Sequence, residues 1–342
     1  MKKVALYLVM FSFMACSSDQ AIKDPIEHFS HTKKIPISVY NNIELESYGI
    51  YRPWECVKTN GKYYVLEEKK GNVFSSINPI TGSFYQGVNI GNGPGEVLLP
   101  ERFMLEGEEV TFYDTTKKRY KLVENKDSTL SVEVFKDIDI ESISYPTFHG
   151  EKILSKGWFV DAWLHYYIGK DEIDTIDFPS FPETDGLNGL EKMSVFKNGQ
   201  QKFSPDGNKA VATISSGCAL AIFDCTDDGL DEVAMLNYFP PEFVAIEYEY
   251  HPLTISRNCK IGFVDVCCTN QFIYALYSGK IFGDDIFTSH YGGYVFVYDW
   301  KGNPVNYYKL EKDLFSIEID EQNGILYGIG NDPEGCILEY KL

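Results

Sequence analysis

Residues 294–305 read Tyr-Val-Phe-Val-Tyr-Asp-Trp-Lys-Gly-Asn-Pro-Val, and this stretch contains the pattern that decides the fold. Its first five residues are aromatic or β-branched, which favours a strand half-buried in a sheet. The next four, Trp300-Lys301-Gly302-Asn303, form a turn signal because glycine and asparagine tolerate positive φ. A strand that ends in a tight turn is the unit of an antiparallel sheet.

The same strand-and-turn unit recurs along the chain, whereas long amphipathic helix patterns are nearly absent. Further strands are predicted at 62–66, 110–113, 219–223 and 272–276. Turn signals occur at 59–61, 79–82, 204–207 and 322–324. The chain is therefore predicted to be an all-β protein.

The groups of strands restart at a regular interval of about 45–60 residues. The restarts lie near Trp54, Pro100, Pro146, Lys202, Gly262 and Phe315. This period suits a four-stranded propeller blade, so we expect a six-bladed β-propeller of antiparallel blades. The alternative is a two-sheet sandwich followed by a second β domain, because the repeats are weak. The third unit, around residues 158–178, departs most from a regular blade.

One predicted strand, at 35–47, lies upstream of the first unit. In a closed propeller, such a strand can pair into the last blade. That pairing locks the ring and removes exposed sheet edges.

The N-terminus predicts export from the cytoplasm. Lys2 and Lys3 precede an apolar run, 4–15, that is too short to span a bilayer as a helix, as in a secretory signal peptide. Ala15-Cys16-Ser17 follows and resembles the lipobox of bacterial lipoproteins. The alternative is an ordinary signal peptide with an incidental cysteine.

The lipobox resemblance implies a diacylglyceryl group on Cys16, which would anchor the protein to the outer membrane without threading the chain through it. The predicted organisation is a signal peptide at 1–15, the lipidated cysteine and a flexible tether at 16–34, and the propeller at 35–342. Whether the body faces the periplasm or the cell surface stays open.

The net charge of the protein restricts the classes of molecule that it can bind. The chain carries a net charge of −19, and removal of residues 1–15 with their two lysines changes it to −21. A body this acidic repels nucleic acid, so none is expected as a partner. Lys117-Lys118-Arg119 is the densest cationic run and is predicted to be a solvated hairpin edge. We expect a monomer.

The cysteines behind Cys16 do not form a disulfide or zinc pattern. They number seven, and an odd number cannot all be paired in disulfides within the chain. No two of them have the C-x-x-C spacing of a zinc site. We expect most of them to be small buried hydrophobic residues.

Three segments carry a family resemblance: Gly91-Asn92-Gly93-Pro94-Gly95-Glu96, residues 297–305, and Ile325-Leu326-Tyr327-Gly328. Together they resemble the TolB-like six-bladed propeller lipoproteins of Gram-negative gut anaerobes, over nearly the whole mature chain. The resemblance implies a fold and a location in the cell envelope, but no reaction. The first segment lacks the spacing of a phosphate-binding loop and is predicted to connect two blades.

Candidate ligand-binding residues flank the first blade. Arg52, Trp54, Glu96 and Arg102 lie near its boundaries, where propeller loops often line the mouth of the central channel. A carboxylate, a guanidinium and an indole can bind a sugar or a peptide. Inter-blade packing and ion pairing are the alternative role for these four side chains.

A second candidate site is a calcium loop. Asp224, Asp228 and Asp231 stand in a segment that resembles the front half of such a loop, but Met235 occupies the position of the bidentate glutamate. The segment is predicted to be an Asp-Gly hairpin between two strands, and calcium binding is the alternative. We predict no cofactor, and calcium is the one ion whose binding to this segment should be tested.

The sequence motifs favour a binding function over catalysis. No phosphate-binding lysine loop, G-x-S-x-G elbow or H-E-x-x-H helix occurs in the sequence. We therefore predict a non-enzymatic module that holds a glycan, peptide or partner protein on the loop face of the propeller. The alternative is a calcium-dependent hydrolase or lyase with its active site at the central channel.

Overall fold

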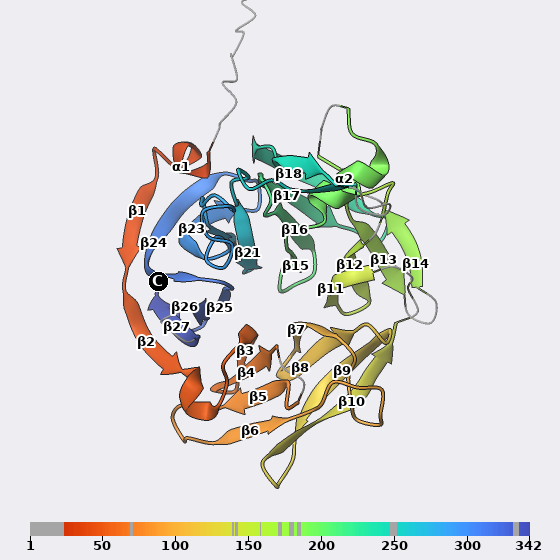
Figure 1. The fold of residues 1–342 in the computed structure, drawn as a ribbon, viewed down its shortest axis with the longest axis vertical. Coiled ribbons are helices and arrows are strands. Elements are labelled where there is room, and N and C mark those ends of the chain that lie inside the picture. Colours follow the sequence, from red (N-terminus) through yellow and green to blue (C-terminus); the bar gives the residue numbers. More distant parts are fainter. Residues whose placement is uncertain are drawn as a thin grey trace, which may run out of the picture.

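The computed structural model describes residues 24–68, 71–138, 140, 143–157, 159–169, 173–177, 181–182, 186–246, 252–330 and 335–342. Within these residues, six four-stranded blades stand around a central axis (Figure 1). The predicted all-β, six-bladed propeller is thereby confirmed. The signal peptide and Cys16 lie outside the described residues, so these two predictions stay predictions.

The first three blades run outward from the channel in chain order. Blade 1 is β3 (Pro53–Thr59), β4 (Lys62–Glu67), β5 (Phe74–Ile77) and β6 (Phe84–Gly87). Blade 2 is β7 (Pro100–Glu106), β8 (Glu109–Asp114), β9 (Lys118–Glu124) and β10 (Thr129–Asp137). Blade 3 is β11 (Ile143–His149), β12 (Lys152–Gly157), β13 (His165–Gly169) and β14 (Ile173–Asp177).

The last three blades include additional segments. Blade 4 is β15 (Gln201–Phe203), β16 (Lys209–Ile214), β17 (Cys218–Cys225) and β18 (Leu230–Phe239), preceded by α2 (Gly189–Phe196). Blade 5 is β21 (Phe263–Cys268), β22 (Phe272–Tyr277), β23 (Gly292–Asp299) and β24 (Pro304–Leu314), preceded by the hairpin β19 (Phe243–Ala245) and β20 (Leu253–Ile255). Blade 6 is β25 (Glu318–Asp320), β26 (Ile325–Gly330), β27 (Cys336–Lys341) and β2 (Val39–Glu44).

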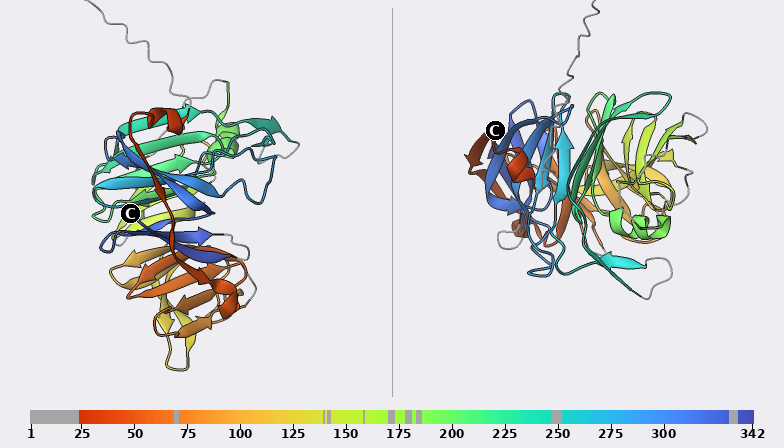
Figure 2. Two further views of the ribbon diagram at one scale, coloured as in Figure 1. Left: turned by 90° about the vertical axis from the view of Figure 1, so that its left-hand side faces the viewer. Right: turned by 90° about the horizontal axis from the view of Figure 1, so that it is seen from above.

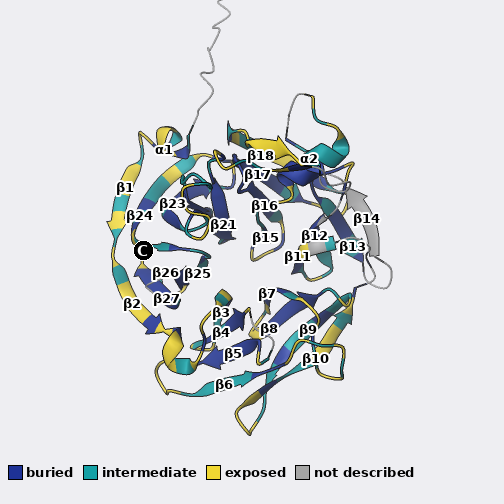
Figure 3. Cartoon of the chain, in the orientation of Figure 1, coloured by how far each residue is buried: buried dark blue, intermediate teal, exposed yellow. Residues whose placement is uncertain are grey.

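Strand β17 shows why these sequences form stacked blades. Side chains alternate between the two faces of a strand. Ala219, Ala221 and Phe223 pack into the core shared with blade 3, whereas Leu220 and Ile222 pack into the core shared with blade 5. A strand between two blades is therefore buried on both faces, as the dark blue interior in Figure 3 shows.

The N-terminal segment closes the ring. Strand β2 pairs antiparallel with β27, and β1 (Lys33–Ile37) pairs parallel with β24, so the segment bridges blades 5 and 6 along their outer edge (Figure 2). The predicted closure is confirmed, although the predicted strand 35–47 is in fact two strands followed by the 3-10 helix η1 (Leu45–Tyr48).

The folded part begins upstream of residue 35, where we placed the end of the tether. Helix α1 (Pro25–His28) is capped by Asp24, whose carboxylate accepts a hydrogen bond from the Ile26 amide at 2.8 Å. Phe29 is fully buried against blade 5. Residues 24–34 are therefore part of the domain. Among the described residues, no helix is both long and apolar enough to cross a membrane.

The seven cysteines behind Cys16 are free thiols, and all but Cys268 are buried. They pack as small hydrophobic residues, as predicted.

Candidate functional site

The two faces of the propeller differ in their loops. Because neighbouring strands of a blade are antiparallel, the first and third loops of each blade open on one face, and the second loop and the blade-to-blade connections open on the other. The described loops of the first face are tight turns such as Asn60-Gly61, with φ of 51° and 72°. The second face has the longer loops, including residues 88–99 and 278–291. Long loops on a rigid scaffold are the usual place for binding residues.

Bulges redirect side chains where the innermost strands start on this second face. The pairing register shifts at Trp54 in β3, at Arg102 in β7 and around Tyr145 in β11. Arg102 and Tyr145 have positive φ values of 44° and 50°, a conformation that is costly for residues other than glycine. Such bulges kink a strand and aim its side chains, and they are common beside binding sites.

A pocket of about 310 Å³ opens on the second face between blades 1 and 2. Trp54 and Tyr145 line it and are 44% and 43% exposed. The loop from β6 to β7 adds the exposed aliphatic side chains of Ile90, Leu98 and Leu99. Exposed apolar side chains gathered in a concavity mark an interaction site.

Three glutamates also line the pocket: Glu67, Glu68 and Glu101. Glu67 and Glu101 are only 4% and 6% exposed, and backbone amides orient both. The Tyr145 amide donates to Glu101 at 2.6 Å, and the Tyr51 amide donates to Glu67 at 3.1 Å. The pocket therefore combines apolar walls with fixed carboxylates.

Trp54 packs against an aromatic ring that lies just ahead of the last blade. Its ring centroid lies 5.4 Å from that of Phe315, which precedes blade 6. The indole lines the pocket and is partly exposed, so it provides a flat surface for a ligand at small cost in conformational entropy.

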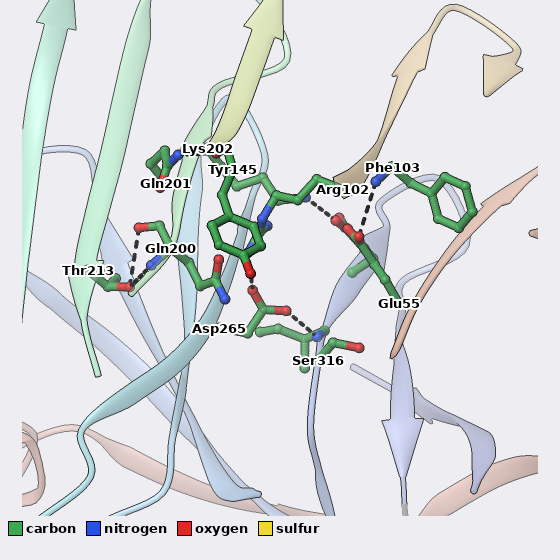
Figure 4. A network of polar contacts seen from close by, with 12 residues as sticks. Glu55, Arg102, Phe103, Tyr145, Gln200, Gln201, Lys202, Thr213, Asp265 and Ser316 are labelled. Carbon is green, nitrogen blue, oxygen red and sulfur yellow. Dashed lines mark hydrogen bonds and ion pairs between the residues drawn. The ribbon is translucent and has the colours of Figure 1, made fainter. Parts of the chain in front are cut away.

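Below the mouth, the innermost strands of five blades bring together a cluster of buried and partly buried charges (Figure 4). Members come from different blades, namely Glu55, Arg102, Lys202, Asp265 and Glu318. Lys202 forms an ion pair with Glu318, and Arg102 Nη2 lies 3.9 Å from Asp265 Oδ1. The amides of Phe103 and Ile317 donate to Glu55 and Asp265 at 3.1 and 2.8 Å. We call these five residues the channel cluster.

Burial dominates the electrostatics of the channel cluster. Desolvation raises the pKa of both Glu55 and Asp265, and the charges of Arg102 and Lys202 oppose that rise. The pKa of Lys202 is raised: burial lowers it, but the neighbouring Glu318 outweighs that effect. Each charge thus depends on partners from other blades.

Comparison with known families identifies the chain. The model of the TolB-like 6-blade propeller-like family matches residues 44–322, from the end of β2 to the turn after β25, the first strand of the last blade. The protein belongs to this family. The predicted TolB-like resemblance is thereby confirmed.

Solved structures similar to this TolB-like propeller share little sequence with it. A luciferin-regenerating enzyme has 10% identity and a TM-score of 0.49, covering 88% of this chain and 95% of its own. The β-propeller domain of Cps50 (Swd1) from Myceliophteria thermophila has 8% identity and a TM-score of 0.46, covering 90% and 100%. A Bacteroides fragilis protein described as exported has 14% identity and a TM-score of 0.48, covering 90% and 99%. None of the curated proteins compared with the chain matches it.

The four predicted ligand residues of the TolB-like propeller do not form one site. Trp54 lines the pocket, whereas Arg102 is buried in the channel cluster. Arg52 is exposed beside β3 and is not among the pocket residues. Glu96 accepts a hydrogen bond from the Gly93 amide at 2.8 Å, so it shapes the 91–96 connection between blades 1 and 2.

The three predicted calcium ligands lie on the face with the tight turns. Asp224 forms an ion pair with Lys209, and it stands opposite Asp231 in the β17–β18 ladder. Asp228 lies in the turn between these strands, where its amide donates to Thr226 Oγ1 at 3.3 Å. The segment is an Asp-Gly hairpin, and no group of three metal-binding side chains occurs within the described part of the chain.

Sequence reasoning missed Tyr145, Glu101 and Glu67. Glu101 and Tyr145 each stand beside a predicted start of a blade, at Pro100 and Pro146. Because those starts mark the innermost strands, comparing equivalent positions of successive units could have identified both residues. Glu67 ends the second strand of its blade, and nothing in its local sequence marks it.

Proposed function

We propose that this TolB-like propeller is a cell-envelope lipoprotein that binds a glycan, peptide or partner protein in the pocket at the channel mouth without converting it. One observation carries the proposal. The half-exposed rings of Trp54 and Tyr145 stand on bulged strands around a pocket that also contains the buried carboxylates of Glu67 and Glu101.

The pocket has the properties of a preorganised binding site. Trp54 and Tyr145 extend from innermost strands, which are held on both sides by neighbouring blades. Little ordering is therefore needed when a ligand arrives, and preorganisation favours affinity. The open aromatic and aliphatic surface would be removed from water by the ligand.

Binding without turnover is supported by the position of the titratable groups. The cations of the channel cluster, buried Arg102 and partly buried Lys202, are close to carboxylates. A general acid or base must reach the reacting atoms. The pocket carboxylates instead accept backbone hydrogen bonds that position them.

Anchoring through Cys16 would keep the pocket near a membrane. Cys16 precedes Asp24, the first described residue, by eight positions. A chain of that length spans at most about 28 Å. A lipid on Cys16 would therefore hold the folded body within a short distance of the bilayer.

The test is a screen of purified residues 17–342 against glycan and peptide arrays, followed by mass spectrometry of every bound compound. We expect ligands to be recovered unchanged. A cleaved or rearranged product formed by the wild-type protein would replace the binding role with an enzymatic one.

A further inference from the structure

We infer that the propeller docks onto an electrically neutral lipid bilayer through exposed apolar side chains on two neighbouring loops of its second face. These side chains, which we call the apolar loop surface, are Phe243, Val244, Ile246, Ile286 and Phe287. The inference rests on the proposed anchor at Cys16 and adds to it an orientation of the folded body relative to the membrane.

The side chains of the apolar loop surface are poorly shielded from water. Their exposed fractions run from 37% at Phe243 to 82% at Phe287. In the described turns of the first face, by contrast, Ile80 is the only large apolar side chain that is exposed to this degree. Exposed apolar side chains gathered on one part of a surface mark a site of contact with a membrane or another protein.

The two loops that carry this surface pack against each other. The Gly283 amide donates a hydrogen bond to the Arg257 carbonyl at 2.7 Å, and the Phe282 amide donates to the Cys259 carbonyl at 2.9 Å. These bonds join the 278–291 loop to the segment that follows β20. The hairpin β19–β20 and the 278–291 loop extend from the same side of the ring (Figure 2). Both can therefore meet one flat partner.

Hydrogen bonds hold the tip of the 278–291 loop. The Asp285 carboxylate accepts from the Phe287 amide at 2.9 Å and from the Thr288 hydroxyl at 2.7 Å. The Ser278 hydroxyl donates to the Ser289 carbonyl at 2.5 Å across the base of the loop. Phe287 is thus presented by a preorganised backbone, which lowers the cost of ordering on contact.

The start of the folded chain brings a bilayer within reach of this surface. Asp24 forms an ion pair with Lys260, and Lys260 stands in a β-bridge with Ile281, at the base of the loop that carries Phe287. The six residues from Ile281 to Phe287 span at most about 21 Å, and the eight from Cys16 to Asp24 at most about 28 Å. For a body already tethered by a lipid, a second contact is intramolecular, so weak apolar contacts suffice.

Charge selects the kind of lipid. The exposed acidic residues Glu242, Asp284 and Asp285 border the apolar loop surface and outnumber the exposed Arg257. The net charge of −19 gives the whole chain the same sign. An anionic bilayer would repel these groups, whereas a bilayer of zwitterionic lipids would not.

Docking in this way leaves the pocket accessible. In a ring of six blades, blade 5 stands opposite blade 2, and the pocket lies between blades 1 and 2. Contact through the loops around blade 5 would tilt the second face, with the pocket on the side away from the contact. The pocket would then meet a ligand close to the membrane.

The test tethers the protein to vesicles without relying on lipidation in the cell. Residues 17–342 carry an N-terminal hexahistidine tag and are bound to phosphatidylcholine vesicles that contain a nickel-chelating lipid. In a Cys268→Ser background, which removes the partly exposed thiol, a polarity-sensitive dye is attached to Val244→Cys or, as a control, to Ile80→Cys on the first face. A lipid-soluble quencher should reduce the emission at position 244 at least about threefold more than that at position 80.

Phe287→Ser should lower the quenching at position 244 by about half or more, because it removes the most exposed side chain of the apolar loop surface. Tyr40→Ser is the matched control, since Tyr40 is 64% exposed on β2, at the outer edge of the ring. That variant should leave the quenching unchanged. Replacing about a third of the phosphatidylcholine by anionic phosphatidylglycerol should weaken it.

The outcomes separate this inference from the proposed function. Equal quenching at positions 244 and 80, or quenching that Phe287→Ser does not change, would overturn the docking inference. A dimer in sedimentation that Phe287→Ser abolishes would assign the surface to a second copy of the chain and would also overturn it. The binding function is tested by arrays without a membrane, and the tag replaces the lipid, so neither the ligand nor the anchor is at stake in this experiment.

Discussion

The guanidinium of Arg102, in blade 2, lies 3.9 Å from the carboxylate of Asp265, in blade 5, across the centre of the ring. Both side chains are buried, and desolvation raises the pKa of Asp265 although Arg102 opposes the rise. Arg102 is therefore buried between blades, whereas we had predicted that it would lie at the mouth of the channel as a ligand-binding residue.

Arg102→Met should lower the free energy of unfolding by about 3–5 kcal/mol, because it leaves Asp265 and Glu55 buried without this cation. The loss should be smaller at pH 5 than at pH 8. A carboxylate whose folded-state pKa is raised contributes stability at low pH and loses it as pH rises through that pKa. Urea unfolding at both pH values measures the effect.

Lys121→Met provides the control, because Lys121 pairs at the surface with Glu109, whose side chain is 50% exposed. We expect a change of about 1 kcal/mol or less. Similar losses in the two variants would mean that Arg102 does not hold the blades together.

Lys156, in β12, predicts a second pH effect. It is 3% exposed and donates to the Thr213 carbonyl at 3.2 Å, and burial, with a smaller contribution from Arg102, lowers its pKa to about 7. Between pH 7 and 10 the unfolded chain binds more protons at this site than the folded protein does. The site should therefore add stability as pH rises, by at most about 1.4 kcal/mol per pH unit.

Near pH 7, burial of Lys156 therefore costs the wild type stability, and this cost falls as pH rises. Lys156→Met removes the cost at every pH. The variant should exceed the wild type in melting temperature most at pH 7, and the difference should shrink towards pH 10. Melting curves that stay a constant distance apart over this range would show that Lys156 keeps its charge throughout.

Phe29 tests the role of the N-terminal segment. Its ring lies 4.8 Å from Phe296 and 4.9 Å from Tyr298, centroid to centroid, and it is fully buried. Phe29→Ala should cost about 3–5 kcal/mol in unfolding free energy, as for other buried aromatics. Ile26→Ala, in the helix that Phe29 caps and 41% exposed, should change it by about 0.5 kcal/mol. Equal effects would mean that the segment does not belong to the core.

Much of the fold could be predicted because the information is local. The predicted restarts at Trp54, Pro100 and Lys202 lie within one residue of the starts of β3, β7 and β15. Turn residues and runs of β-branched and aromatic side chains mark these boundaries directly.

The site was less predictable because it depends on contacts between distant residues. Arg102 is buried and has a positive φ, and nothing in the sequence around it predicts either property. Arg119 shows the same limit. We expected a solvated edge there, but Arg119 is 1% exposed, pairs with Glu106 at 2.7 Å and lies over the Phe148 ring of the next blade.

Cys16→Ser tests the proposed anchor. The variant should be released from the membrane or left unprocessed, because the lipid supplies the membrane affinity. The measurement is the fraction of protein that remains with membranes after a carbonate wash. Cys268→Ser, which keeps the proposed lipid site, should stay bound. Full retention of the Cys16→Ser protein would refute lipid anchoring at this residue.

The most direct measurement of the central claim is the dissociation constant of the best array ligand for Trp54→Ala and for Phe287→Ala. Phe287 is 82% exposed in the loop between β22 and β23, on the same face as the pocket but in blade 5. Provided that both variants melt like the wild type, Trp54→Ala should weaken binding by about 1–3 kcal/mol and Phe287→Ala should not change it. Wild-type affinity in Trp54→Ala, or a loss confined to Phe287→Ala, would contradict a binding site at the channel mouth.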